Sequence, residues 1–247
     1  MGREVLLGIA ILHPAVRRSG TEKHMKRNHM TLAATTVAAL LFLLTLGASS
    51  ASADSFILTS CHVSGGCGTA TSFGTVVLTQ VGTSTVNVVV SLSGGNRFVE
   101  TGAGGKEFFL FNGSLSGSTI TTIATVPGGV VPGGLSGFTN LSPVHTGGAG
   151  DFTASVECTT FSDCNGGSAP TVTGLTFTVT NATVAQLETK NASGNFFAAD
   201  ILLANNGKTG VVDANAKTPT VPDGGRTLML LGGGLVGLEI LCRKFRV

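Results

Sequence analysis

The chain has 247 residues, among them 36 Gly and 14 Phe but neither Trp nor Tyr, and only 11% of its residues are charged. An ordinary soluble domain has about 25% charged residues, and nucleic-acid binding requires clustered Lys and Arg, usually with stacking aromatic side chains. The composition therefore argues against nucleic-acid binding. The 42% of hydrophobic residues and the formal net charge of +2 argue against intrinsic disorder.

The positive charge is concentrated at the two ends of the chain. Between Asp54 and Thr220 the sequence has five basic and nine acidic side chains, so the net charge of this central segment is 5 minus 9, or −4. We expect no basic patch for an acidic partner in the central segment. The terminal segments are therefore considered separately from the fold.

Residues 25–53 have the three parts of a secretory signal peptide. A basic start, Met25-Lys26-Arg27-Asn28-His29, precedes an apolar run centred on Val37–Leu46, and the small-residue site Ala51-Ser52-Ala53 follows. This layout predicts that signal peptidase cuts before Asp54. An uncleaved membrane anchor is the alternative, but the apolar part is short for a span of about 20 residues.

Residues 1–24 precede the signal and fit none of its parts. Met25 and Met30 both lie close to the start of the signal, and translation can begin at either of them. We therefore interpret residues 1–24 as a misassigned N-terminal extension.

The central segment predicts β-strands separated by short turns. Thr85–Ser93 alternates four aliphatic side chains on one face with mostly polar ones on the other, which is typical of a half-buried strand. Gly94-Gly95-Asn96 then predicts a turn, with Arg97–Thr101 returning antiparallel as a hairpin. Similar short runs predict strands at Phe56–Ser60, Thr75–Val81, Glu107–Asn112, Thr119–Val126, Asp151–Thr159, Leu175–Thr180, Val184–Thr189, Phe196–Leu203 and Gly210–Asp213.

About ten such strands predict one all-β domain over residues 54–220, an antiparallel β-sandwich or jelly roll, because two packed sheets bury two apolar faces. The Phe residues of this segment are expected to form most of the bulky core. Val126–Gly134 doubles a Val-Pro-Gly-Gly unit, and residues 127–150 are predicted to form an exposed loop. The last two strands are predicted to form a hairpin that turns at Asn205-Asn206-Gly207. Oxygen ligands at that turn could also hold calcium, although the usual calcium-loop spacing does not occur.

Four cysteines of the central segment fall into two equal spacings, Cys61 with Cys67 and Cys158 with Cys164. Equal short spacings with Gly-rich or polar interiors favour two local disulfides in an oxidising compartment. Crossed pairing of the four cysteines is an alternative. A four-thiolate metal site is a third, disfavoured because zinc sites use shorter spacings.

Catalytic motifs are scarce in the central segment. Its two histidines are His62, inside the first cysteine loop, and His145, in a Gly-rich stretch. The carboxylates are scattered and indicate no pair for glycoside hydrolysis. The sequence therefore predicts a protein that is not an enzyme and holds no cofactor or metal. The scattered carboxylates are Asp151, Glu157, Asp163, Asp200 and Asp213.

The C-terminal segment, residues 221–247, has three parts in a fixed order. Val221-Pro222-Asp223 precedes a 16-residue apolar run, Thr227–Cys242, and a basic cluster of Arg243, Lys244 and Arg246 closes the chain. Positive charge after an apolar segment keeps that end in the cytoplasm. A short permanent anchor is the alternative, although a run of 16 residues that includes Glu239 is marginal as a span.

This ordered arrangement resembles the C-terminal sorting signal of the PEP-CTERM class, in the variant whose motif begins Val-Pro-Asp. The resemblance implies that an exosortase, a membrane-embedded cysteine protease, removes the tail and passes the protein outward. It also implies a Gram-negative bacterium, an inner-membrane intermediate and a final location at the cell surface or in the extracellular matrix. The expected partners during export are signal peptidase and exosortase, with transient anchoring in the membrane.

Two hypotheses follow for the central domain. The first is a structural protein of the cell surface or of an exopolysaccharide-associated matrix, with exopolysaccharide as a partner. The second is a secreted carbohydrate-binding module or carbohydrate-active enzyme on a β-sandwich. The absence of Trp and Tyr disfavours the second hypothesis, because sugars are usually bound by stacking on aromatic rings.

Overall fold

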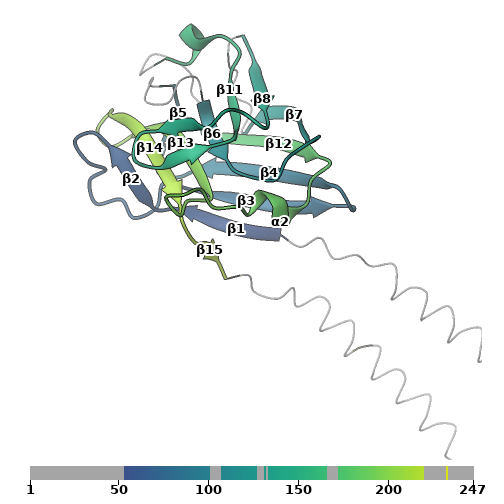
Figure 1. Cartoon of the computed structure of the whole chain (residues 1–247). Coiled ribbons are helices and arrows are strands. Elements are labelled where there is room, and N and C mark those ends of the chain that lie inside the picture. The colour runs from purple at the N-terminus through teal and green to yellow at the C-terminus, as the bar shows by residue number, and fades with distance from the viewer. Residues whose placement is uncertain are drawn as a thin grey trace, which may run out of the picture. The chain divides into compact units, whose positions relative to one another are not determined.

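The computed structural model describes residues 53–100, 107–126, 131, 133–165, 172–219 and 232. The chain divides into two compact units, Met1–Ser50 and Ala51–Val247, and the described residues all belong to the second unit. They form an antiparallel all-β domain (Figure 1), as the sequence predicts. The predicted extension, most of the signal peptide and the sorting motif with its basic cluster lie outside the described residues.

The strands form two large sheets. The first has the order β15-β1-β3-β4-β12-β7, and the second has the order β2-β14-β13-β6-β11-β8, with β5 paired to β13. β9 and β10 form a separate two-stranded sheet. The bounds of the first sheet are β1 Ala53–Leu58, β3 Gly74–Val81, β4 Thr85–Leu92, β7 Thr119–Thr125, β12 Gly174–Thr180 and β15 Lys217–Thr218. Those of the other strands are β2 Ser60–Val63, β5 Arg97–Phe98, β6 Glu107–Phe111, β8 Leu135–Phe138, β9 Val144–Thr146, β10 Gly150–Phe152, β11 Ala154–Cys158, β13 Phe197–Leu202 and β14 Thr209–Ala214.

Phenylalanine rings join the two sheets across one core. Phe177 of β12 contacts Phe109 and Phe111 of β6, with ring centroids 6.0 and 5.8 Å apart. Phe56 of β1 meets Phe197 of β13 edge to face at 4.8 Å. All five rings are at most 1% exposed. Such aromatic pairs favour offset or tilted contacts, so the Phe-rich, Trp-free composition is used as predicted, to fill the space between the sheets.

Two segments of the chain cross from one sheet to the other and close one side of the core. β1 lies in the first sheet and β2 in the second, and only Thr59 separates them. The Thr59 amide donates to the carbonyl of Asp213 at 2.9 Å. The reverse crossing joins β14 to β15 after Ala214. Strands that switch sheets at a bend form corners of this kind in packed sheets.

The predicted hairpin over residues 85–101 is wrong. β4 pairs with β3 and β12, whereas β5 pairs with β13 in the opposite sheet. Asn96 begins the crossing, since its side-chain oxygen accepts from the amide of Ala204. The turn at Gly94-Gly95 is real, but it directs the chain into the second sheet, because β4 is already paired on both edges.

The predicted strand at Val184–Thr189 is also wrong, since Val184–Leu187 forms the short helix α2. Thr183 caps the helix, and Gln186 accepts from the amide of Thr183 at 2.8 Å. This reciprocal Thr-x-x-Gln arrangement is a capping box. Val184 and Leu187 are both buried, and their spacing of three residues places them on one face of a helix. The remaining helical turn is the 3-10 segment η1, Phe161–Asp163.

Residues 127–150 are not one exposed loop. Within this stretch the structure describes β8 in the second sheet and β9 in the small hairpin. Gly137 lies within β8, and Gly147 and Gly148 lie next to β9, so the glycine content that favours a loop conceals both strands. The other predicted hairpin is confirmed, since β13 and β14 pair antiparallel on either side of Asn205-Asn206-Gly207.

Candidate functional site

The two ends of the described domain meet in the first sheet. β1 and β15 pair antiparallel, with Ser55 opposite Thr218 and Phe56 opposite Lys217. β1 begins at Ala53, one residue before the predicted cut, and β15 ends at Thr218, three residues before the predicted sorting motif. Pro219 follows β15 and has no amide to extend the pairing.

Three charged side chains join this corner, and we call them the end clamp: Asp54, Glu188 and Lys217. The Lys217 ammonium lies 2.7 Å from Asp54 Oδ2 and 2.8 Å from Glu188 Oε1. The Asp54 and Glu188 side chains are only 12% and 19% exposed, whereas that of Lys217 is 38% exposed. Glu188 is the C-cap residue of α2, so the clamp ties the helix to both terminal strands.

The clamp shifts the ionisation of two of its members. Burial of Glu188 raises the pKa of its carboxyl above 4.5, and the neighbouring Asp54 carboxylate adds to this rise against the lowering effect of Lys217. Burial alone would lower the pKa of Lys217. Hydrogen bonds and charge attraction from Asp54 and Glu188 outweigh that effect, and the pKa of Lys217 is raised above 10.5. Two carboxylates therefore share one ammonium.

The residues of the predicted cleavage and sorting segments are only partly described. Ala53 is exposed and Asp54 is buried at the start of β1. Ala51, the motif Val221-Pro222-Asp223 and the basic residues Arg243, Lys244 and Arg246 lie outside the described residues. Among the residues that are described, no helix is long and apolar enough to cross a membrane.

The four cysteines are placed in the two local pairs that the spacing predicts. Cys61 pairs with Cys67 and Cys158 with Cys164, with Cα atoms 6.3 and 6.4 Å apart. These pairs are at disulfide distance. Asn205 and Asn206 of the β13–β14 turn donate from their side-chain amides to the carbonyls of Cys67 and Gly66. The turn considered for calcium therefore holds the first disulfide loop against the second sheet.

The second disulfide lies beside a buried carboxylate, Glu100. The side chain of Glu100 is fully buried, and its Oε1 accepts from the amide of Cys158 at 2.8 Å. Its own amide donates to the carbonyl of Cys164. A carboxylate with two cysteines has the composition of a metal site, but both sulfur atoms belong to the disulfide. The arrangement instead fixes the Cys158–Cys164 loop at the end of β11.

Each histidine of the described domain pairs with an aspartate. His62 Nε2 lies 2.6 Å from Oδ2 of Asp213, which is 1% exposed. His145 Nδ1 lies 2.7 Å from Oδ1 of Asp151 across the β9–β10 hairpin, where both side chains are exposed. The first pair joins neighbouring strands β2 and β14, and the second joins β9 and β10.

The β9–β10 hairpin covers the outer face of the second sheet over the first histidine pair. Ala149 and Phe152 pack there against a small apolar cluster, and the side-chain amides of Asn191 and Asn195 donate to the carbonyl of Ala149. Gly148 passes so close to the His62 ring that a Cβ atom at this position would clash with it. The hairpin turn therefore lies against the His62 ring, which contacts the buried Asp213. The other members of the cluster are Leu110, Ala198 and Val211.

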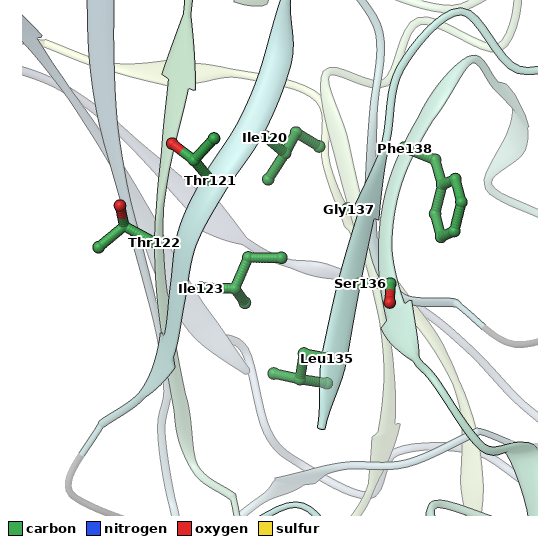
Figure 2. A pocket seen from close by; sticks show the side chains of 8 residues that line it. All are labelled: Ile120, Thr121, Thr122, Ile123, Leu135, Ser136, Gly137 and Phe138. Carbon is green, nitrogen blue, oxygen red and sulfur yellow. The ribbon is translucent and has the colours of Figure 1, made fainter. Parts of the chain in front are cut away.

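A shallow groove of about 460 Å³ separates β7 from β8, the end strands of the two sheets (Figure 2). Ile120, Ile123 and Leu135 point into it, and these side chains also pack against the main core. Thr122 has a φ of 52° at a bulge in β7, an uncommon conformation for a β-branched residue. No ionisable side chain lines the groove. The groove therefore exposes apolar side chains at the edge of the main core, where β7 and β8 end the two sheets.

Phe138 of β8 also lines this groove, but its ring points away from Ile120 and Ile123 (Figure 2), and the residue is 41% exposed. A second, smaller pocket of about 140 Å³ adjoins it and is lined also by Ser136, Glu157, Cys158 and Thr159. This pocket brings one exposed aromatic ring together with two hydroxyl groups and a carboxylate. The carboxylate is that of Glu157, one of the scattered carboxylates of the sequence.

Sequence reasoning missed the end clamp and the histidine pairs. Lys217 and Asp54 are far apart in sequence, and no local motif announces their contact. The Thr183-x-x-Gln186 capping box was the one available signal, because it places Glu188 at the end of a helix. No protein-family model, curated protein or solved structure matches the chain.

Proposed function

We propose that the protein is an exported structural domain, sorted by an exosortase to the cell surface or to an exopolysaccharide-associated matrix. The observation that carries this proposal is the extent of the folded domain. Its strands run from Ala53 to Thr218, and all of their residues except Ala53 lie between the predicted signal-peptidase cut and the predicted sorting motif. Cysteine pairs at disulfide distance support an oxidising compartment outside the cytoplasm.

The pairing of β1 with β15 supports the same proposal. Both processing points would lie at one corner of the domain, because Ser55 and Thr218 are opposite each other. A chain tethered to the membrane at either end would therefore present this corner to it. Neither cut would remove a described residue of the buried core.

The test is the intact mass of the protein recovered from the surface of its native bacterium. We expect a chain that begins at Asp54, lacks the segment after Val221 and retains two disulfides. Replacing Pro222 with Ala, or deleting Arg243–Val247, is expected to leave full-length protein in the inner membrane. Surface protein of parental mass from both variants would contradict the sorting proposal.

Sugar binding at Phe138 is the second candidate, supported by the exposed ring beside the hydroxyls of Ser136 and Thr159. We expect Phe138→Ala to abolish retention on immobilised exopolysaccharide from the same bacterium, and Val81→Ala, which changes another exposed apolar residue, to leave retention unchanged. Equal retention of both variants and the parent would argue against this role.

A further inference from the structure

The end clamp carries one negative charge too many. Asp54 and Glu188 contribute two carboxylates, and Lys217 is the ammonium between them, so the three groups sum to −1 at neutral pH. Burial limits the screening of this excess by water, because both carboxylates are at most 19% exposed. The raised pKa of Glu188, caused by burial and by the nearby Asp54, agrees with a site that lacks positive charge.

The missing charge is the one that signal-peptide removal would create. A cut before Asp54 turns the backbone nitrogen of that residue into an α-amino group, whose ordinary pKa is about 7.7–8.0. This nitrogen is four covalent bonds from the Asp54 carboxylate oxygens, so the new ammonium must lie beside the clamp. The cut would therefore place a second cation next to the two carboxylates.

We propose that signal-peptide removal completes the clamp, so that two ammonium groups balance two carboxylates and hold β15 against β1. The inference rests on the proposed function only in taking Asp54 as the mature N-terminus. β15 has two residues and ends at Pro219, so its backbone pairing is short. The ion pairs of Lys217 therefore contribute to the attachment of β15 to β1. In the cleaved form, β15 is held more firmly than in the precursor.

The experiment uses the exported protein recovered from its bacterium, with its N-terminus identified by sequencing. Its α-amino group is acetylated near pH 6.5, where lysine side chains stay protonated, and mass spectrometry verifies a single acetyl group at the N-terminus. Thermal unfolding of both forms is then compared at pH 7. The same comparison is made for Glu188→Gln, whose clamp balances without the α-ammonium, and for the control Asp151→Asn, which removes a carboxylate from an exposed pair.

We expect acetylation to lower the unfolding temperature of the parent and of Asp151→Asn by about 2–4 °C, the shift for loss of one favourable interaction in a domain of this size. In Glu188→Gln we expect no decrease. An unchanged parent, or an equal decrease in Glu188→Gln, overturns the inference while the cleavage point stands. An N-terminus other than Asp54 overturns both the cleavage point and the inference.

Discussion

Lys217 is the residue that links the two terminal strands to α2. It contacts carboxylates from two other segments of the chain, Asp54 and Glu188, and its ammonium is partly exposed. Contacts of this kind are weakened by solvent and salt. Their value to the fold therefore depends on the burial of the carboxylates, which would face each other uncompensated without the lysine.

Replacing Lys217 with Met is expected to reduce the free energy of unfolding by about 0.5–1 kcal/mol at pH 7, the upper range for partly exposed ion pairs. Because the pKa of Lys217 is raised in the folded state, its contribution is present below pH 10.5 and is lost as the pH rises through the folded-state value. Urea unfolding between pH 7 and 11 checks both points. If Lys217→Met lost as much unfolding free energy as the parent between pH 7 and 11, the pH dependence could not be assigned to Lys217.

Gly148 is a residue of the β9–β10 hairpin that lies against the second sheet at His62. Its φ of +89° favours glycine, and a Cβ atom there would strike the His62 ring. Gly194 has a similar φ of +87° with open space around it. The two positions share the cost of the backbone conformation and differ in the contact.

We expect Gly148→Ala to destabilise the domain by about 1–3 kcal/mol more than Gly194→Ala, because overpacking adds to the backbone strain. The measurement is urea unfolding of both variants beside the parent. Proton spectra of His62 are expected to change only in Gly148→Ala. Equal losses of stability in Gly148→Ala and Gly194→Ala would mean that the hairpin moves to accommodate the new Cβ atom and leaves the His62–Asp213 contact undisturbed.

At the scale of the element, β7 and β8 form the open side of the two-sheet arrangement. Gly137 of β8 lies against Ile120 of β7, and a Cβ atom at Gly137 would come within 2.5 Å of the Ile120 side chain. The absence of a side chain at Gly137 thus lets the end strands of both sheets approach each other. β7 also contains a bulge, which is a common feature of edge strands.

We expect Gly137→Ala to destabilise the domain by about 1–3 kcal/mol through overpacking. In the double variant with Ile120→Ala, this added cost should largely disappear, because the clashing branch is removed. Unfolding free energies of the parent, both single variants and the double variant give the interaction energy. Additive losses would show that the two strands do not contact each other in this way.

The elements differ in how far the sequence predicts them. β3, β4 and β12 alternate buried with more exposed side chains over most of their length, and this period, typical of a sheet buried on one face, predicts all three strands. α2 was mistaken for a strand, since four residues give too short a window to distinguish periods of 2 and 3.6. β8 and β9 are not predicted, because glycines in and beside them indicate a loop. Gly137 of β8 instead allows close packing, and Gly148 lies in the turn after β9.

At the scale of the whole molecule, the disulfides secure loops at the second sheet. Cys158 and Cys164 are at most 1% exposed, whereas Cys67 is 7% exposed and Cys61 only partly buried. Each bridge closes a loop with a sequence separation of six. The entropic contribution of the two bridges is therefore equal, and their surroundings decide the difference between them.

Replacing Cys61 and Cys67 together with Ala is expected to cost roughly 2 kcal/mol, the loop-closure value for so short a ring. Replacing Cys158 and Cys164 should cost at least 1 kcal/mol more, because it also opens a cavity beside the buried Glu100. Urea unfolding under non-reducing conditions compares the two. A larger loss of unfolding free energy on replacing Cys61 and Cys67 would contradict this prediction and would mean that the disulfide at β2 stabilises the domain more.

The candidate site depended on contacts that no local pattern encodes. The fold class and the cysteine pairs followed from alternation and spacing, which are local properties. The end clamp joins residues 54, 188 and 217, and His62 meets Asp213 only after β2 pairs with β14. Such contacts depend on the order of the strands in each sheet. A single sequence of an antiparallel β-protein does not determine that order, because many strand orders bury the same apolar faces.

The crossing of strands between sheets also governs when the domain can fold. β2 pairs with β14, and one edge of β1 pairs with β15. The first strands of the domain therefore cannot complete their pairing until its last strands are available. Loops of this length must close before either sheet is finished, and such non-local pairing is slow. A chain leaving the cytoplasm from its N-terminus would therefore remain unfolded until almost all of it had been translocated.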